Sequence, residues 1–306
     1  MELYNIHPDF MKYKGFKPPM NAVILPIVNF ALQRVANRKN QPVGLIKDTY
    51  RIHGYMNGMI RLDIFQPRDM NDDSPCLVYF HGGAFVMKAA PHHIWLAQKY
   101  ALETSCKVVF VDYRLLPRHP FPVGIEDAFS AYDWVLQNTG MLGIDPSRIA
   151  VGGDSAGGAI VAAVCLMARD RKVSMPCFQM LIYPATDIRQ NTESMKEFTD
   201  TPLWNSKLNA KLWKKYLRNG SGEKPEYASP ALAENLKGMP PAYVEVAEYD
   251  CLRDEGVAFA EALEKDGVSV ELFESKQTVH GFEVVQQNDI VAECVKRRIA
   301  TLKAHL

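Results

Sequence analysis

The sequence has no excess of charge of either sign, no long apolar run and no closely paired cysteines. Lysine plus arginine and aspartate plus glutamate each number 35 in the 306 residues, so the net charge does not favour nucleic acid or anionic lipid as a partner. The apolar stretch 22–32 is too short to span a bilayer, and the first residues lack the basic and apolar regions of a signal peptide. We therefore expect a cytoplasmic protein that binds neither nucleic acid nor a membrane.

The six cysteines are scattered, without a Cys-x-x-Cys pair and without the spacing of a metal site. We expect them to be reduced and mostly buried, as isolated cysteines usually are. Nothing in the sequence indicates a bound metal ion or an organic cofactor, so we expect neither.

Short apolar strands alternate with helical patterns along most of the chain, which is typical of an α/β fold with a mainly parallel sheet. Two earlier strands, 49–52 and 60–65, have no helix between them, so these two strands could pair antiparallel. The alternating strands are expected at 77–80, 108–111, 149–151, 178–183, 242–247 and 268–273.

Two segments do not fit this alternation and are expected to lie over the main domain, which spans residues 45–306. Residues 1–44 form one of them, with helical apolar spacing at 22–35. The other is the insertion 186–220, in which Leu208, Leu212 and Tyr216 recur at helical spacing among lysines. A helix lying on a membrane surface would show the same pattern, but we favour a lid packed on the protein.

The stretch 148–158 combines a short apolar strand, a glycine-flanked serine and the start of an uncharged helix. Its segment 153–157 fits the pattern Gly-x-Ser-x-Gly. A sharp strand-to-helix turn requires glycine on both sides of the serine, and it exposes the hydroxyl at a helix N-terminus. The pattern therefore predicts Ser155 as a nucleophile.

A serine hydroxyl needs a base, and the base needs an acid that orients it. In this type of fold, the acid and the base follow the serine on loops after later strands. Asp250 and His280 have those positions. The other histidines lie near the termini, in an early hairpin, in a proline-rich loop, in the first turn of a helix or before the serine. Asp254 and Glu255 stay open as alternative acids, although both are expected to face solvent at a helix start.

A third feature predicts a binding site for a developing oxyanion. Residues 81–84 follow a strand and contain two adjacent glycines, which allow the backbone to approach a substrate oxygen. We predict that the amides of Gly82, Gly83 and Ala156 donate hydrogen bonds to this oxygen.

The chain resembles the hormone-sensitive-lipase-like family of bacterial α/β-hydrolase esterases. The likeness covers roughly residues 75 to 285, and it rests on the following segments: 81–85, 112–122, 153–158, 250–256 and 280–282. It implies an α/β-hydrolase fold, with Ser155 as nucleophile, Asp250 as acid and His280 as base.

The resemblance also implies the three oxyanion amides named above, a helical cap from residues 1–44 and 186–220, and a homodimer as one oligomeric state. Two residues depart from the family pattern. Cys251 replaces a proline, which could loosen the loop that carries Asp250, and Arg118 replaces a glutamate with no evident consequence.

The residues and the resemblance together predict a serine carboxylesterase acting on small-molecule, short-chain acyl esters. Bulky walls from Phe85, Trp204, Phe282 and Trp213 are expected to shorten the acyl pocket. Two alternatives remain open. One is a deacetylase or amidase using the same triad. The other is a non-catalytic ligand receptor of the same fold, although receptors that resemble this family lack the histidine that is present here.

Overall fold

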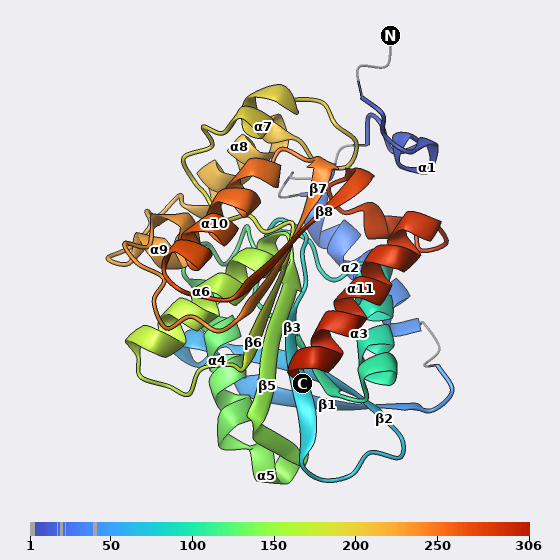
Figure 1. Cartoon of the computed structure of the whole chain (residues 1–306), viewed down its shortest axis with the longest axis vertical. Helices are drawn as coiled ribbons and strands as arrows, with labels where there is room; N and C mark the ends of the chain where they lie inside the picture. The colour runs from blue at the N-terminus through green and yellow to red at the C-terminus, as the bar shows by residue number, and fades with distance from the viewer. Residues whose placement is uncertain (1–3, 17, 19–20, 22, 39–41) are drawn as a thin grey trace.

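The computed structural model describes all residues except 1–3, 17, 19–20, 22 and 39–41. One eight-stranded sheet runs through it in the order β1-β2-β4-β3-β5-β6-β7-β8 (Figure 1). Only β1–β2 and β2–β4 are antiparallel pairs, and all other neighbours are parallel. The strands are β1 Leu45–His53, β2 Met59–Pro67, β3 Ser74–Phe80, β4 Lys107–Asp112, β5 Ile144–Asp154, β6 Phe178–Ile182, β7 Ala242–Tyr249 and β8 Val270–Val279.

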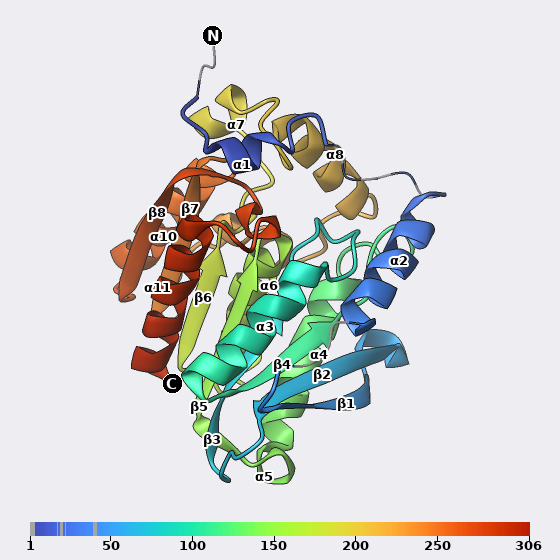
Figure 2. The same ribbon diagram turned by 90° about the vertical axis from the view of Figure 1, so that its right-hand side faces the viewer.

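Helices cover both faces of the sheet (Figures 1 and 2). One face carries α3 (Pro91–Thr104) and α11 (Asp289–His305), and the other carries α4 (Val123–Gln137), α6 (Ala156–Asp170) and α10 (Arg253–Lys265). Central strands that are covered on both faces are mostly apolar, unlike strands with one face exposed to solvent, and every residue of β6 is buried. The predicted α/β architecture is therefore confirmed, including the antiparallel pair near the start. Short elements connect the main ones: η1 Tyr55–Asn57, α5 Thr139–Leu142 and η3 Phe282–Val284.

The insertion lies beyond the carboxyl ends of the strands, beside the N-terminal segment (Figure 2). It contains α7 (Glu193–Glu197) and α8 (Ser206–Tyr216), and the same connection between β6 and β7 continues through α9 (Pro225–Ala228) and η2 (Pro230–Leu232). The connection between β6 and β7 is thus longer than the predicted insertion 186–220. As expected from the spacing, α8 buries Leu208, Leu212 and Tyr216.

The N-terminal segment contains α1 (Pro8–Met11) and α2 (Leu25–Arg38). The helix predicted over 22–35 thus forms, but residue 22 lies outside the described residues. Leu25 is buried, and the Asn29 side chain donates to the Val86 carbonyl at 2.8 Å and accepts from the Lys88 amide at 2.9 Å. These contacts fix α2 on the loop after β3, whereas its apolar residue Ile27 is 68% exposed.

All six cysteines are free, and all but the half-buried Cys177 are buried, as predicted. Within the described ranges, no helix is long and apolar enough to cross a membrane.

Candidate active site

Ser155 occupies a strained turn between β5 and α6, with φ 56° and ψ −118°. A non-glycine residue with positive φ is uncommon, and such strain concentrates at functional sites. The turn depends on its flanking glycines, because a Cβ on Gly153 would lie 2.6 Å from the Phe80 carbonyl oxygen, and one on Gly157 only 1.9 Å from it. The Ser155 amide donates to the Ile182 carbonyl at 2.8 Å. The serine is therefore held by the backbone at the N-terminus of α6.

Three sequence-predicted residues meet at this turn. His280 Nε2 lies 2.8 Å from Ser155 Oγ, and His280 Nδ1 lies 2.6 Å from Asp250 Oδ2. Asp250 follows β7 and His280 follows β8, so both come from the same edge of the sheet as the serine after β5. With a proton on Nδ1, the imidazole donates to Asp250 and accepts from the serine hydroxyl, which is the arrangement of a nucleophile, a base and an orienting acid.

The two alternative acids have other partners. Asp254 Oδ2 accepts from the Ser194 amide at 2.7 Å. Glu255 is 1% exposed and accepts from the Thr186 amide at 2.7 Å, so the prediction that it faces solvent is wrong. Its burial raises the pKa of the Glu255 carboxyl well above the ordinary value. Both side chains hold the start of the insertion instead of contacting His280.

Burial and two hydrogen bonds hold the loop that carries Asp250, in which Cys251 replaces the proline of the family pattern. Cys251 is completely buried, and its carbonyl accepts from the Ser194 hydroxyl at 3.0 Å. The Leu252 amide donates to Asp250 Oδ1 at 3.0 Å, which orients the carboxylate from within the loop.

The loop after β3 corrects one prediction. The Gly82 amide donates to Asp154 Oδ2 at 3.1 Å, and a Cβ on Gly82 would lie 2.2 Å from that oxygen, so this amide is not available to a substrate. Gly83 and Ala84 instead line the cavity beside Ser155. The Ala84 amide thus replaces that of Gly82 as a candidate oxyanion donor. The Ala156 amide is the first of α6, where no acceptor exists within the helix.

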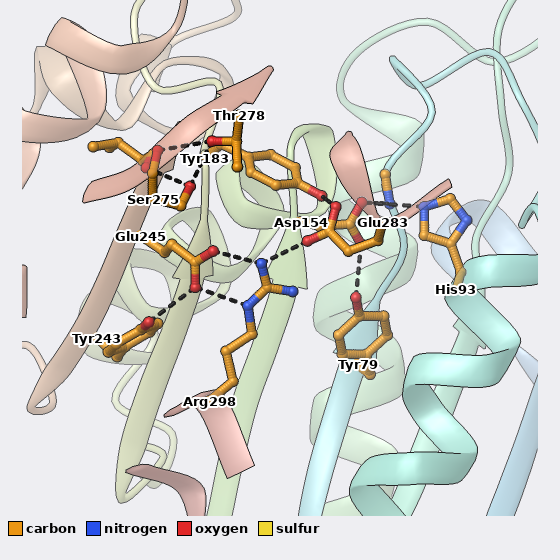
Figure 3. A network of polar contacts seen from close by, with 12 residues as sticks. Tyr79, His93, Asp154, Tyr183, Tyr243, Glu245, Ser275, Thr278, Glu283 and Arg298 are labelled. Carbon is orange, nitrogen blue, oxygen red and sulfur yellow. Dashed lines mark hydrogen bonds and ion pairs between the residues drawn. The ribbon is translucent and has the colours of Figure 1, made fainter. Parts of the chain in front are cut away.

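Asp154, which precedes the nucleophile, holds this loop through a network that the sequence did not reveal (Figure 3). Its carboxylate accepts from the Tyr79 hydroxyl at 2.7 Å and contacts His93 Nε2 at 3.1 Å, in addition to the Gly82 amide. His93 Nδ1 accepts from the Ala90 amide, so Nε2 carries the proton and donates. Burial by itself would raise the pKa of Asp154, but the proximity of His93 and the hydrogen bonds lower it below the ordinary value.

A cavity of about 230 Å³ opens in front of Ser155 and His280. Its walls come from the main domain, from α2 through Val28 and Leu32, and from the insertion through Leu203 and Trp204. Trp204, one of the predicted pocket residues, thus lines this cavity. Trp213 is buried but does not line this cavity.

The other two predicted pocket residues, Phe85 and Phe282, do not line the cavity. Phe85 has a positive φ of 52° and its ring stacks on Tyr216 at 4.1 Å. Phe282 follows Gly281, which has φ 70°, and its ring packs 5.9 Å from that of Phe10 in α1. In both cases a left-handed backbone at or before the ring directs it into the core.

Arg118, the second departure from the family pattern, is exposed and borders a separate hollow of about 400 Å³ beneath α2. Its side chain makes no hydrogen bond or ion pair with the described part of the chain. No cluster of three or more histidine, cysteine, aspartate or glutamate side chains among the described residues could hold a metal ion.

Comparisons with known proteins agree on the family. The family model described as the alpha/beta hydrolase fold matches residues 77–284. Esterase LipI of Mycobacterium tuberculosis is 40% identical over 74% of this chain and 71% of its own length. Carboxylesterase NlhH of the same organism is 38% identical over 81% of this chain and 79% of its own.

Solved structures give the same result over nearly the whole chain. A bacterial heroin esterase matches with a TM-score of 0.89 and 31% identity, covering 99% of this chain and 98% of its own. An esterase from the archaeon Pyrobaculum calidifontis matches with a TM-score of 0.85 and 35% identity, covering 94% and 93%. The chain therefore belongs to the hormone-sensitive-lipase-like family of α/β-hydrolases, and it is a carboxylic ester hydrolase.

Proposed function

We propose that the protein hydrolyses short-chain esters of small molecules through a Ser155-His280-Asp250 triad and an acyl-enzyme intermediate. The observation that carries this proposal is the position of the His280 ring, with Nε2 2.8 Å from Ser155 Oγ and Nδ1 2.6 Å from the buried Asp250. One imidazole thus joins the nucleophile to the orienting acid.

The reaction proceeds in two halves. His280 Nε2 takes the hydroxyl proton while Ser155 Oγ attacks the ester carbonyl carbon, and the proton then passes to the departing alcohol. In the second half, His280 removes a proton from water, the resulting hydroxide attacks the acyl carbon, and Ser155 Oγ leaves with the proton as the carboxylic acid is released. No step requires a metal ion or an organic cofactor.

The negative charge of each tetrahedral intermediate is assigned to the amides of Gly83, Ala84 and Ala156. Gly83 and Ala84 line the cavity next to the nucleophile, and Ala156 follows it. Fixed backbone donors at a helix N-terminus stabilise such a charge without reorganising during the reaction.

Deacetylation and amide hydrolysis use the same triad, so these reactions remain alternatives that substrate tests decide. A purely receptor-like function is disfavoured, because a receptor has no need of a histidine in hydrogen-bond contact with a strained serine.

The experiment compares Ser155→Ala with the wild type. We expect kcat/KM for p-nitrophenyl acetate to fall by roughly 10⁴-fold or more in the folded variant. A phosphonate inhibitor should add one adduct to each wild-type chain and none to the variant. Near-normal activity of Ser155→Ala would refute the triad.

Acyl length provides a second test. Each CH₂ that is transferred to an apolar wall gains about 0.8 kcal/mol, but the cavity that Trp204, Leu203 and Leu32 help to line has a volume of only about 230 Å³. We expect kcat/KM for p-nitrophenyl esters, measured below their micelle concentrations, to peak at about two to six acyl carbons and then to decline. A value that still rises at decanoate would show a long groove instead.

A further inference from the structure

Arg298 of α11 lies completely buried between the carboxylates of Glu245 and Glu283 (Figure 3). Its Nε and Nη2 donate to Glu245 at 2.8 and 2.6 Å, and Nη2 also donates to Glu283 at 2.5 Å. Burying three charged groups is unfavourable unless each has close partners, and apolar side chains of similar size often stabilise a core equally well. This cluster therefore suggests a role beyond stability.

Glu283 connects the cluster to the active site. It belongs to η3, three residues after His280, so its position fixes the backbone of the loop that carries the base. Its second carboxylate oxygen accepts from the Tyr183 hydroxyl at 2.6 Å.

Tyr183 provides the other connection. It follows β6, its ring centroid lies 4.7 Å from that of His280, and it lines the cavity together with Ser155. Glu283 thus acts on His280 along two routes, through the backbone of the loop and through the tyrosine ring.

We propose that Arg298, Glu283 and the Tyr183 hydroxyl are positioning residues that hold the His280 imidazole in line with Ser155. The inference rests on the proposed function, because these residues are proposed to position the base of the proposed triad. Arg298 itself does not line the cavity, so it acts only through Glu283 and Tyr183.

The chain offers a matched control within the same cluster. The Tyr243 hydroxyl donates to Glu245 at 2.9 Å, on the β7 side. Tyr243 and Tyr183 are both buried, and each donates one hydroxyl to one carboxylate. Tyr243→Phe and Tyr183→Phe therefore each remove one buried hydrogen bond to a carboxylate. Tyr183 contacts Glu283 and the His280 ring directly, whereas Tyr243 is connected to them only through Glu245 and Arg298.

The experiment measures kcat, KM and the urea midpoint for both variants. A 1 Å misplacement can lower a rate by about 10²-fold, so we expect the loss of one tether to lower kcat of Tyr183→Phe by about 10-fold, with KM changed less than about 2-fold. Tyr243→Phe should keep the wild-type kcat, although its urea midpoint should fall by about as much as that of Tyr183→Phe. Equal kcat for the two variants would overturn the inference.

A second pair of variants tests Glu283 itself. Glu283→Gln retains an acceptor for the Tyr183 hydroxyl, whereas Glu283→Ala removes it. We expect Glu283→Gln to recover most of the kcat that Glu283→Ala loses. A kcat that is equally low in both folded variants would contradict a positioning role for this hydrogen bond.

Phosphonate labelling separates misplacement from partial unfolding. If His280 is misplaced, the rate of labelling should fall in parallel with kcat, while the final adduct remains one per chain. A final adduct that falls in proportion to kcat would assign the loss to unfolded protein and refute the inference. Failure of the triad itself has a different signature, since the wild type would then take up no adduct at Ser155.

Discussion

Lowering the pH should destabilise the protein through His81, a residue in the loop after β3. The His81 ring is completely buried and stacks on Tyr113 at 4.7 Å and on Phe110 at 5.7 Å. Its Nδ1 donates to the Gly82 carbonyl at 2.6 Å, and its Nε2 has no hydrogen-bond partner in the described part of the chain. Burial, and secondarily the nearby His93, lowers the pKa of His81 from 6.5 to about 4.

The sign and size of the effect follow from this difference. A histidine whose pKa is lower in the folded state contributes stability that is fully present above about pH 6.5 and is lost as the pH falls through about 4. At about 1.36 kcal/mol for each pH unit between the two values, the complete loss is about 3 kcal/mol. About 2 kcal/mol of it should be lost by pH 5.

The assay is urea unfolding at pH 7.5 and pH 5 for the wild type and for His81→Asn. The asparagine amide can replace the Nδ1 donor but does not titrate, so the variant reports the effect of all other groups. We expect the free energy of unfolding to fall between the two pH values by about 2 kcal/mol more in the wild type than in the variant. An equal fall in both proteins would refute the buried, neutral state of His81.

Two further predictions concern the acidic residues that follow β7. Asp250→Asn should lower kcat by roughly 10² to 10⁴-fold, because His280 loses the group that orients its proton. Asp254→Asn should change kcat far less, because the Asp254 carboxylate accepts from the Ser194 amide and from Arg253 Nε and does not contact His280; a larger effect at Asp254 would show that the acid is misassigned. Because the pKa of Glu255 is raised in the folded state, its contribution to stability is complete below about pH 4.3 and is lost as the pH rises above that value. The difference in the free energy of unfolding between the wild type and Glu255→Gln, measured by urea unfolding, should therefore change with pH. A difference that stays constant with pH would contradict a raised pKa.

The parts of the site that follow from sequence are those set by the order of elements along the chain. Ser155, Asp250 and His280 each come directly after a strand, and the carboxyl ends of parallel strands meet at one edge of the sheet. The need for glycine on both sides of the serine could also be predicted from sterics, because a Cβ on Gly153 or Gly157 would collide with the Phe80 carbonyl oxygen. Periodicity was likewise enough to predict α8 and its buried face.

The parts that sequence could not give depend on backbone direction in three dimensions. Gly82 and Ala84 lie two residues apart, and only the fold shows that the first amide faces Asp154 and that the second borders the cavity. The direction of the Phe85 ring could not be predicted either, because nothing in the sequence indicates that this non-glycine residue has a φ of 52°. His93 lies in the first turn of α3, but its partner Asp154 is the unspecified residue before the serine of the Gly-x-Ser-x-Gly motif, so no spacing in the sequence connects the two.

The buried polar groups explain why the site tolerates so much strain. Asp154 holds the loop after β3, Glu255 holds the start of the insertion, and Glu283 holds the loop that carries His280. Each is an acidic side chain one to five residues from Ser155, Asp250 or His280, and each accepts hydrogen bonds from a different element. A positive φ at Ser155 costs free energy that only a surrounding structure fixed from several sides can offset. Variation at these three carboxylates should therefore change the rate of ester hydrolysis even though none of them contacts the triad side chains through a described hydrogen bond.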